Sequence, residues 1–401
     1  MGTRSPGLLH RILCDHWSRA KDKVLARLPC AVAAAAETAI EKALRCRTDE
    51  MGFAQYRCAD CGATHKVHFS CKSRFCPSCG IARAQEAAAN AQGRLLNVGH
   101  RHLTFSVPSE LRALLYERRE LLAVVAKAAA LATIHAIGTR CRNHPPLPGV
   151  MATVHTYGRD LNFHVHVHVL CTAGGLRADN VWQPVKLYPA MQYRRLWQYY
   201  LLTLLRQKLK KECPGDRSAQ WRIGRLFKKY PTGFIANVMS QYRNGKQAAA
   251  YCCRYTGRPP LSEKRIIAYD GQKVTLAFTD YRDNKDKTIE LSAEEFLFRL
   301  LQHVWPRYQR DVHYYGLYQP SRRKEHVAKV AQASRYKDQV RPIPPLSRRE
   351  RLIDAMAGLE LLCPACGGHL LFDYLELPSK RYAKTSTGPP DRASPQLALS
   401  V

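Results

Sequence analysis

The sequence predicts an α+β fold, in which an antiparallel sheet with flanking helices follows a helical and cysteine-rich N-terminal region. Helical patterns alternate with short strand patterns along the chain, and Cys-x-x-Cys pairs recur near the N-terminus. In addition, histidine alternates with valine from His164 to Val169. Because strand side chains alternate between the two faces of a sheet, this run predicts a strand with one histidine face and one valine face.

Composition limits the class of protein. The chain has 401 residues, of which 46% are hydrophobic, enough for two or three cored units. The formal net charge of +31 favours a polyanionic partner, nucleic acid first of all. The chain has no signal-peptide pattern and no run of about 18 apolar residues, so we expect no membrane attachment. Fifteen cysteines favour thiolate metal sites in a reducing cytoplasm over a disulfide framework.

Residues 1–50 form the predicted N-terminal helical region. Leucine and isoleucine recur at helical spacing from Leu8, and Pro29 interrupts the pattern before an alanine-rich stretch. This region is expected to pack against the domains that come after it in the chain.

Residues 51–95 form the predicted zinc-binding domain. Two Cys-x-x-Cys pairs have the spacing of a tetrahedral thiolate site, and each is followed directly by glycine, which tight knuckle turns favour. We expect one structural Zn²⁺ to be held by Cys58, Cys61, Cys76 and Cys79. A second ion could be held by Cys46 and Cys71 with His65 or His68.

Residues 96–305 form the predicted catalytic region. The expected elements are a strand over 101–107, a helix over 109–138, a strand over 151–157, a turn over 158–160, the histidine strand, a helix over 191–211, a strand over 233–240, a helix from Asn244 through Tyr255, and a hairpin of 274–278 with 287–291.

The histidine strand favours a divalent metal site. Imidazoles at i and i+2 lie about 7 Å apart at Cα, so two neighbours can reach one ion, whereas the outer two of three hardly can. We therefore expect two ligands among His164, His166 and His168. The preceding antiparallel strand makes His155 the leading third ligand. A site without thiolate accommodates Mg²⁺ or Mn²⁺ with an open position for a phosphate oxygen, and structural zinc is the competing interpretation.

Two tyrosines share one face of the helix expected after Asn244. Tyr251 and Tyr255 are four residues apart, a spacing that by itself is more often a packing stripe. Arg254 and Arg258 could hold a phosphate beside them and favour the phenolate. A metal near tyrosine and arginine predicts nucleophilic attack on a DNA phosphodiester.

Residues 306–375 form a basic C-terminal region. Its Lys and Arg side chains are interleaved with tyrosines, a combination typical of single-strand binding: Tyr308, Tyr314, Tyr315, Tyr318 and Tyr336. Cys363 and Cys366 form half a zinc knuckle, whose partners could be distant cysteines or a second chain, unless the pair binds no metal. Residues 376–401 are predicted to be a disordered tail.

Taken together, the motifs resemble the rolling-circle transposases of the insertion sequence 91 family, within the His-hydrophobic-His endonuclease group. The stretches that carry the resemblance are Ser70-Cys-Lys-Ser-Arg-Phe-Cys76-Pro-Ser-Cys79, Leu161-Asn-Phe-His-Val-His-Val-His168, Tyr251-x-x-x-Tyr255-Thr256 and Leu291-Ser-Ala-Glu-Glu-Phe296. They occur in the family's order.

The resemblance implies that an N-terminal zinc domain precedes a catalytic domain that nicks and rejoins single-stranded DNA at element ends and targets, through a 5′-phosphotyrosyl intermediate. The family's histidine pair maps to His166 and His168, and its tyrosines to Tyr251 and Tyr255, with Tyr255 the first choice. The protein would act in the cytoplasm of a prokaryote, at the nucleoid. Host helicase or replication factors would separate the strands, because the chain lacks a Gly-x-x-x-x-Gly-Lys phosphate loop.

Two alternatives remain open. A plasmid replication initiator or relaxase would use the same chemistry. A zinc-dependent DNA-binding regulator without catalysis would use both tyrosines only for packing. The oligomeric state does not follow from the sequence.

Overall fold

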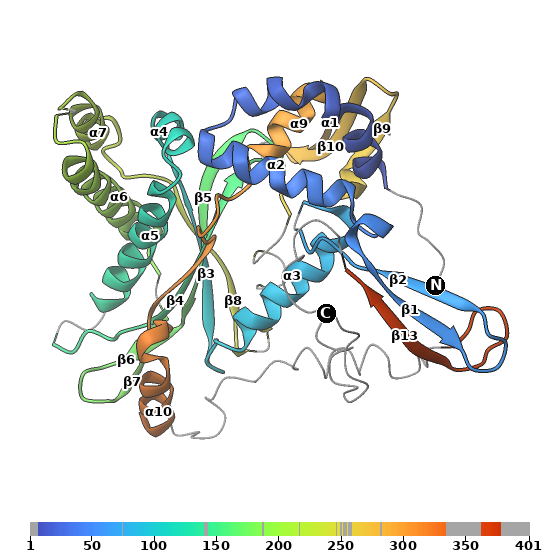
Figure 1. Cartoon of the computed structure of the whole chain (residues 1–401). Coiled ribbons are helices and arrows are strands. Elements are labelled where there is room, and N and C mark those ends of the chain that lie inside the picture. The colour runs from blue at the N-terminus through green and yellow to red at the C-terminus, as the bar shows by residue number, and fades with distance from the viewer. Residues whose placement is uncertain are drawn as a thin grey trace.

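A computed structural model describes residues 7–73, 75–139, 143–186, 188–215, 217–245, 247–248, 251, 255, 259–280, 283–333 and 362–377. The α+β class with antiparallel sheets and flanking helices is confirmed (Figure 1). Of the four sheets among the described residues, three have at least three strands: a central sheet, a small sheet near the N-terminal helices, and a sheet that joins the zinc-binding region to the C-terminal region. The fourth is a two-stranded hairpin.

The central sheet has five antiparallel strands in the order β12-β4-β5-β3-β8. They are β3 (His100–Ser106), β4 (Gly149–Tyr157), β5 (Phe163–Thr172), β8 (Ala236–Tyr242) and β12 (Val312–Gly316). The edge strand β12 pairs with β4, so the sheet includes residues beyond position 305, where the sequence placed the end of the catalytic region.

The predicted histidine strand is β5. Its valines, Val165, Val167 and Val169, are fully buried in a core formed with α5 (Leu121–Gly138) and α6 (Ala190–Glu212). The alternating histidines therefore point to the opposite face of the sheet. Figure 1 shows α5 and α6 on one side of the sheet and α3 (Pro77–Gln92) on the other.

The single helix predicted over 109–138 is instead broken into η2 (Ser109–Leu111), α4 (Arg112–Glu117) and α5. The break allows Arg119 to turn inward, where it is 4% exposed. Its guanidinium donates to the carbonyl of Tyr116 over 3.0 Å and to that of Gln302 over 2.8 Å. Burial lowers the pKa of Arg119 to about 10. The break therefore costs one helical turn but allows Arg119 to form a buried hydrogen bond with Gln302, which is distant in sequence.

Helix α5 is long and apolar enough to cross a membrane by length and composition alone. In this fold it is a core helix, because most of its side chains are buried against β4, β5 and α6. Helix α7 (Arg217–Lys229) packs on α6. The short hairpin of β6 (Gly174–Leu176) and β7 (Trp182–Pro184) lies at the other end of the sheet, beside α10 (Arg323–Ala333) (Figure 1).

The N-terminal helices do not form a separate unit. Helices α1 (Leu8–Ala26) and α2 (Cys30–Leu44), separated at Pro29 as predicted, share one hydrophobic core with β9 (Ile266–Tyr269), β10 (Lys273–Asp280), β11 (Lys285–Ser292) and α9 (Ala293–Leu301). Two amphipathic helices cannot bury their apolar stripes alone, and this distant segment covers them. The predicted hairpin of β10 and β11 is confirmed. The Ser292 hydroxyl accepts from the Glu295 amide and caps α9.

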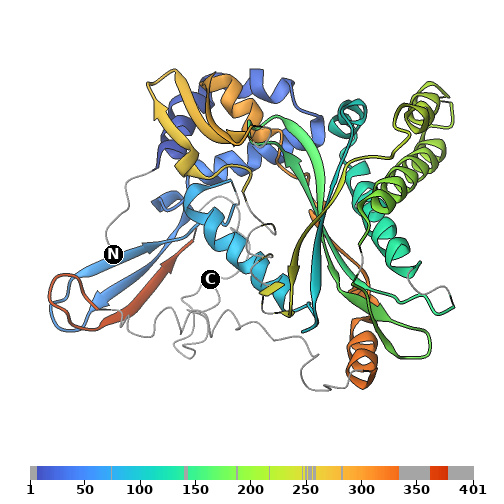
Figure 2. The same ribbon diagram turned by 180° about the vertical axis from the view of Figure 1, so that it is seen from behind.

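The third sheet joins distant parts of the chain in the order β13-β1-β2. Strands β1 (Phe53–Cys58) and β2 (Thr64–His68) come from the predicted zinc-binding domain, and β13 (Leu370–Glu376) comes from the C-terminal region (Figure 2). Glu376, predicted to begin a disordered tail, instead ends a paired strand; residues 378–401 lie outside the described residues. Among the described residues, further helices are η1 (Asp49–Met51), η3 (Glu263–Arg265) and η4 (Pro320–Arg322), and residues 247–248, 251 and 255 are also helical.

Candidate active site

Three histidines converge on one face of the central sheet. His155 on β4 lies directly opposite His166 on β5, and His168 is two residues further along β5. One ring nitrogen of each of the three lies within 4.8 Å of the others. The structure thus brings His155, the third ligand expected from the hairpin, together with two histidines of the run. His164 lies outside this group, because three alternating strand positions span too much length to meet at one point.

One nitrogen of each ring has a hydrogen-bond partner outside the group. His155 donates from Nε2 to the main-chain carbonyl of Tyr255 over 2.9 Å, and His166 donates from Nδ1 to the carbonyl of His164 over 3.3 Å. The Nδ1 of His168 lies 3.1 Å from Nε2 of His102, a buried histidine on β3. Metal-binding histidines typically hydrogen-bond through the nitrogen that does not bind the metal, which fixes the tautomer and the orientation of the ring.

The protonation state of the histidines also favours the binding of a cation. Burial is the main cause that lowers the pKa of His166 to about 3, and it lowers the pKa of His168 well below its usual range. Neighbouring histidines lower both further. Both rings are therefore neutral near pH 7, and neutral imidazole is the form that binds metals. The donor set fits a divalent ion with imidazole ligands.

The two tyrosines differ in access. The ring of Tyr255 is half-buried, and its centroid lies 4.2 Å from that of His168. Tyr251 is fully buried in a core with Met151 and Leu170, and its ring centroid is 4.7 Å from that of Tyr255. The structure therefore supports Tyr255 over Tyr251 as the tyrosine that a substrate can reach. Arg254 and Arg258, the candidate phosphate-binding residues, lie outside the described residues.

His102 is a site residue that was not predicted from the sequence. Its ring contacts those of His168, Tyr251 and Tyr255, with centroid separations of 5.3, 4.7 and 5.1 Å. The position of His102 within the strand predicted over 101–107, two residues after His100, was the available signal. That signal points to the site only through the pairing of β3 with β5.

The cysteines form two groups of four, which corrects the predicted zinc site. The expected single set of Cys58, Cys61, Cys76 and Cys79 is divided between the groups. One group comprises Cys46, Cys71, Cys76 and Cys79, and the other comprises Cys58, Cys61, Cys363 and Cys366. Knuckle spacing identifies pairs of ligands, but the tertiary fold decides which pairs meet.

The first group is built around the start of α3. The Cys46 and Cys79 sulfurs are 3.5 Å apart, and the Cys71 amide donates to the Cys46 sulfur over 3.3 Å. A hydrogen bond from the Cys71 thiol is the main cause that lowers the pKa of Cys46 to about 7. Four clustered sulfurs, one of which accepts a main-chain amide, suit a tetrahedral zinc site. Neither His65 nor His68 belongs to this group.

Within the described part of the C-terminal region, the tyrosines do not form one stacking surface. Tyr318 is 1% exposed, and its hydroxyl lies 2.6 Å from Nε2 of buried His100, so it is a core residue. Tyr308 is 87% exposed, and Tyr336 lies outside the described residues. The prediction was wrong for Tyr318 because the interleaving of basic and aromatic residues in the sequence does not show which tyrosine rings are buried.

A basic surface instead covers α7. Trp221 is 62% exposed there, and the guanidinium of Arg225 lies 4.8 Å from the centroid of its ring. The other exposed long side chains of α7 are all basic: Arg217, Arg222, Lys228 and Lys229. An exposed indole among cations provides both stacking and phosphate contacts.

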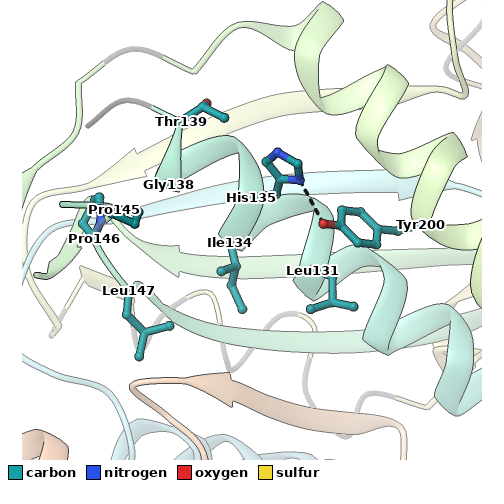
Figure 3. Close-up of a pocket in the computed structure, with 9 residues that line it drawn as sticks. All are labelled: Leu131, Ile134, His135, Gly138, Thr139, Pro145, Pro146, Leu147 and Tyr200. Carbon is teal, nitrogen blue, oxygen red and sulfur yellow. Dashed lines mark hydrogen bonds between the residues drawn. The ribbon is translucent and has the colours of Figure 1, made fainter. Parts of the chain in front are cut away.

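A surface groove of about 580 Å³ lies between α5, α6 and the segment around Pro146. It is mainly apolar, and Nδ1 of His135 lies 2.9 Å from the Tyr200 hydroxyl at its wall (Figure 3). Because α5 and α6 cover the valine face of β5, this groove is separate from the histidine group.

Comparisons with known proteins match the zinc-binding region and the region of the histidine group to two separate families. Residues 12–107 match the family described as "Transposase zinc-binding domain", and residues 149–326 match the family described as "Putative transposase". The second range contains the three grouped histidines and both tyrosines.

Two curated relatives match most of the chain. The "Transposase for insertion sequence element IS801" of Pseudomonas savastanoi pv. phaseolicola is 30% identical over 286 residues, which cover 69% of this chain and 68% of the relative. The "Putative transposase y4qJ" of Sinorhizobium fredii is 27% identical over 351 residues, which cover 82% and 85%. No solved structure matches the chain.

Proposed function

The chain belongs to the insertion sequence 91 family of transposases, and we propose that it cuts and rejoins single-stranded DNA at the ends of its element with Tyr255 as the nucleophile. The observation that carries this proposal is the position of Tyr255. Its ring lies 4.2 Å from that of His168, and its carbonyl accepts the hydrogen bond of His155. These two contacts hold the proposed nucleophile beside the three histidines that would bind the metal.

The histidine group would hold the catalytic cation. His155, His166 and His168 fit Mg²⁺ or Mn²⁺, with ring orientations fixed by their hydrogen-bond partners. When bound, the cation polarises a non-bridging oxygen of the scissile phosphate and neutralises charge that develops on it. His155 and His168 position the main chain and the ring of Tyr255 next to that phosphate.

The chemical step is a transesterification. The phenol of Tyr255 loses its proton, a bond forms between its Oη and phosphorus, and the bond from phosphorus to the 3′ oxygen breaks. The 3′ oxygen leaves as a hydroxyl after gaining a proton, and the 5′ phosphate remains on tyrosine. Because the number of phosphoester bonds is unchanged, a second 3′ hydroxyl can reverse the reaction and join strands without a nucleotide cofactor.

Tyr251 has a supporting role in this proposal. It is buried beneath Tyr255 and His102, so a second nucleophilic step by Tyr251 would need the helix to move. Structural Zn²⁺ at Cys46, Cys71, Cys76 and Cys79 would hold the start of α3 against the end of α2. Strand separation would be supplied by host helicase or replication factors in the cytoplasm.

The test is a search for the covalent product. Purified protein is incubated with Mg²⁺ or Mn²⁺ and single-stranded DNA that carries a verified element end and a label at its 3′ terminus, and the products are resolved on a denaturing gel. We expect a labelled protein band that Tyr255→Phe abolishes and Tyr251→Phe retains. Tyr308→Phe, at an exposed tyrosine whose ring contacts none of the three histidines, is the matched control.

Each other outcome has a definite meaning. An adduct that survives Tyr255→Phe and disappears in Tyr251→Phe would transfer the nucleophile to Tyr251. Sequence-specific binding without any adduct would replace the transposase mechanism by the regulator alternative. Adduct formation on a plasmid origin in preference to the element end would favour a replication initiator or relaxase.

A further inference from the structure

The second cysteine group joins parts of the chain that are far apart in sequence. The sulfurs of Cys58 and Cys366 are 3.5 Å apart, and those of Cys61 and Cys363 are 3.7 Å apart. These pairs are separated by 308 and 302 positions along the chain. All four are free thiols, and their sulfurs lie within 4.8 Å of one another.

Both halves of this group have the same local structure. Each is a Cys-x-x-Cys-Gly loop whose glycine has a positive φ, 72° at Gly62 and 76° at Gly367. Each glycine amide donates back to the carbonyl of the first cysteine, over 3.1 Å and 2.8 Å. The repeated positive φ favours glycine, because a Cβ would be strained there. Two separate segments have therefore acquired the same knuckle.

The strands beside the knuckles are paired. Strand β13 runs antiparallel to β1, with Cys58 opposite Leu370 and Phe53 opposite Glu376. Between the knuckles the Ala59 amide donates to the His369 carbonyl over 3.0 Å. Because β13 leaves most of its side chains exposed, including Leu371 and Phe372, burial contributes little to holding it.

We propose that Cys58, Cys61, Cys363 and Cys366 bind a second zinc ion, which fastens β13 to β1 and so holds the C-terminal region on the zinc-binding domain. Four sulfurs on paired knuckles are the donor set of a tetrahedral structural zinc site. The zinc-binding family match ends at residue 107, so it contains only half of these ligands. The site is therefore a property of the folded chain rather than of the N-terminal domain alone.

The two zinc sites differ in exposure. Cys61 and Cys366 are exposed, whereas the cysteines of the first group are buried or half-buried. A chelator that must contact the sulfurs and the ion reaches the second site more easily. The second ion is therefore expected to leave first, and the first ion to remain.

Zinc content of the full-length protein, measured by mass spectrometry of the metal, tests the assignment. We expect about two ions per chain in the unmodified protein and about one in Cys58→Ser/Cys61→Ser, in Cys363→Ser/Cys366→Ser and in the variant that combines all four changes. Cys30→Ser/Cys213→Ser removes two exposed cysteines outside both groups and should leave the content unchanged.

Two results would overturn the proposal. Unchanged zinc content in Cys363→Ser/Cys366→Ser would mean that the C-terminal pair binds no ion. The second such result is the loss of one ion in Cys58→Ser/Cys61→Ser and of one ion in Cys76→Ser/Cys79→Ser, with no further loss when these two double variants are combined. It would mean that Cys58, Cys61, Cys76 and Cys79 hold a single ion together.

A second measurement addresses the fastening role without requiring activity. Amide hydrogen exchange is compared in the unmodified protein and in Cys363→Ser/Cys366→Ser, and the pairing of β10 with β11 provides the internal control. We expect the amides of β1 and β13 to exchange at least tenfold faster in the variant, and those of β10 and β11 to be unchanged. Unchanged protection of β13 would show that strand pairing alone holds it, and would refute the fastening role.

Discussion

The Nε2 of His155 donates a hydrogen bond to the main-chain carbonyl of Tyr255 over 2.9 Å. One contact therefore connects a proposed metal ligand on β4 with the proposed nucleophile, 100 positions later in the chain. Since a nitrogen that carries its proton cannot bind a metal, His155 would bind through Nδ1. The hydrogen bond thereby couples the orientation of the ligand to the position of the tyrosine.

His102 is expected to tune metal affinity without binding the metal. A His102→Phe substitution preserves ring packing against Tyr251 but removes the nitrogen that faces His168. Loss of such an outer partner typically weakens metal binding by about 10- to 100-fold. Titration of zinc-loaded protein with Mn²⁺, followed by electron paramagnetic resonance, measures this change.

His164→Ala is the matched control for that titration. His164 lies on the same strand but outside the three-histidine group, and alanine retains the main-chain carbonyl that accepts from His166. Its Mn²⁺ affinity should match that of the unmodified protein. If His164→Ala weakened binding as much as His102→Phe, the assignment of ligands from the group would be wrong.

His100 is expected to make the fold sensitive to mild acid. It is fully buried, accepts from the Tyr318 hydroxyl and donates to the Val98 carbonyl, and burial lowers its pKa to about 4. Between pH 6.5 and 4 the unfolded chain binds a proton that the folded chain does not. The free energy of unfolding therefore falls as the pH decreases through this window, by about 2 kcal/mol at pH 5 from this residue.

The variant His100→Gln keeps an acceptor for the Tyr318 hydroxyl but cannot titrate. Urea unfolding of both proteins at pH 7 and pH 5 should show a smaller loss of stability in the variant. The contributions of the zinc sites and of the other histidines are common to both proteins and cancel in the comparison. Equal pH dependence in the two would show that the His100 environment accommodates the charged ring.

The basic face of α7 is expected to contact DNA. Trp221→Ala removes a stacking surface worth about 1–3 kcal/mol per base, and Arg222→Glu/Arg225→Glu removes two cations. Binding of single-stranded DNA, measured by fluorescence anisotropy across salt concentrations, should weaken in both variants. The salt slope should decrease by about one for each lost phosphate contact, and only in the arginine variant.

Lys264→Glu/Lys285→Glu reverses two exposed charges outside α7, one in η3 and one at the start of β11, and so matches the net-charge change of the arginine variant. It should change affinity much less than the arginine variant does. An effect of equal size would mean that the overall field of the protein, rather than α7, determines binding.

The sequence predicted those features that local periodicity and tight turns determine. Alternation placed histidine and valine on opposite faces of β5, and the turn before Phe163 made the hairpin that brings His155 opposite His166. His102 escaped prediction because β3 reaches β5 through a pairing between segments far apart in sequence. Knuckle spacing could not reveal that Cys58 and Cys61 meet Cys363 rather than Cys76, since both sets have the same local pattern.

The pairing of β1 with β13 also determines when the fold can be completed. Cys61 can meet Cys363 only after the ribosome has added 302 more residues. At about 5–20 residues per second, the nascent chain carries an incomplete knuckle for about 15–60 seconds. For most of that interval all four cysteines of the first group have been synthesised, whereas β13 does not yet exist. The thiols of Cys58 and Cys61 are consequently exposed to oxidants and competing metals during synthesis, and a ribosome that stops early leaves them so.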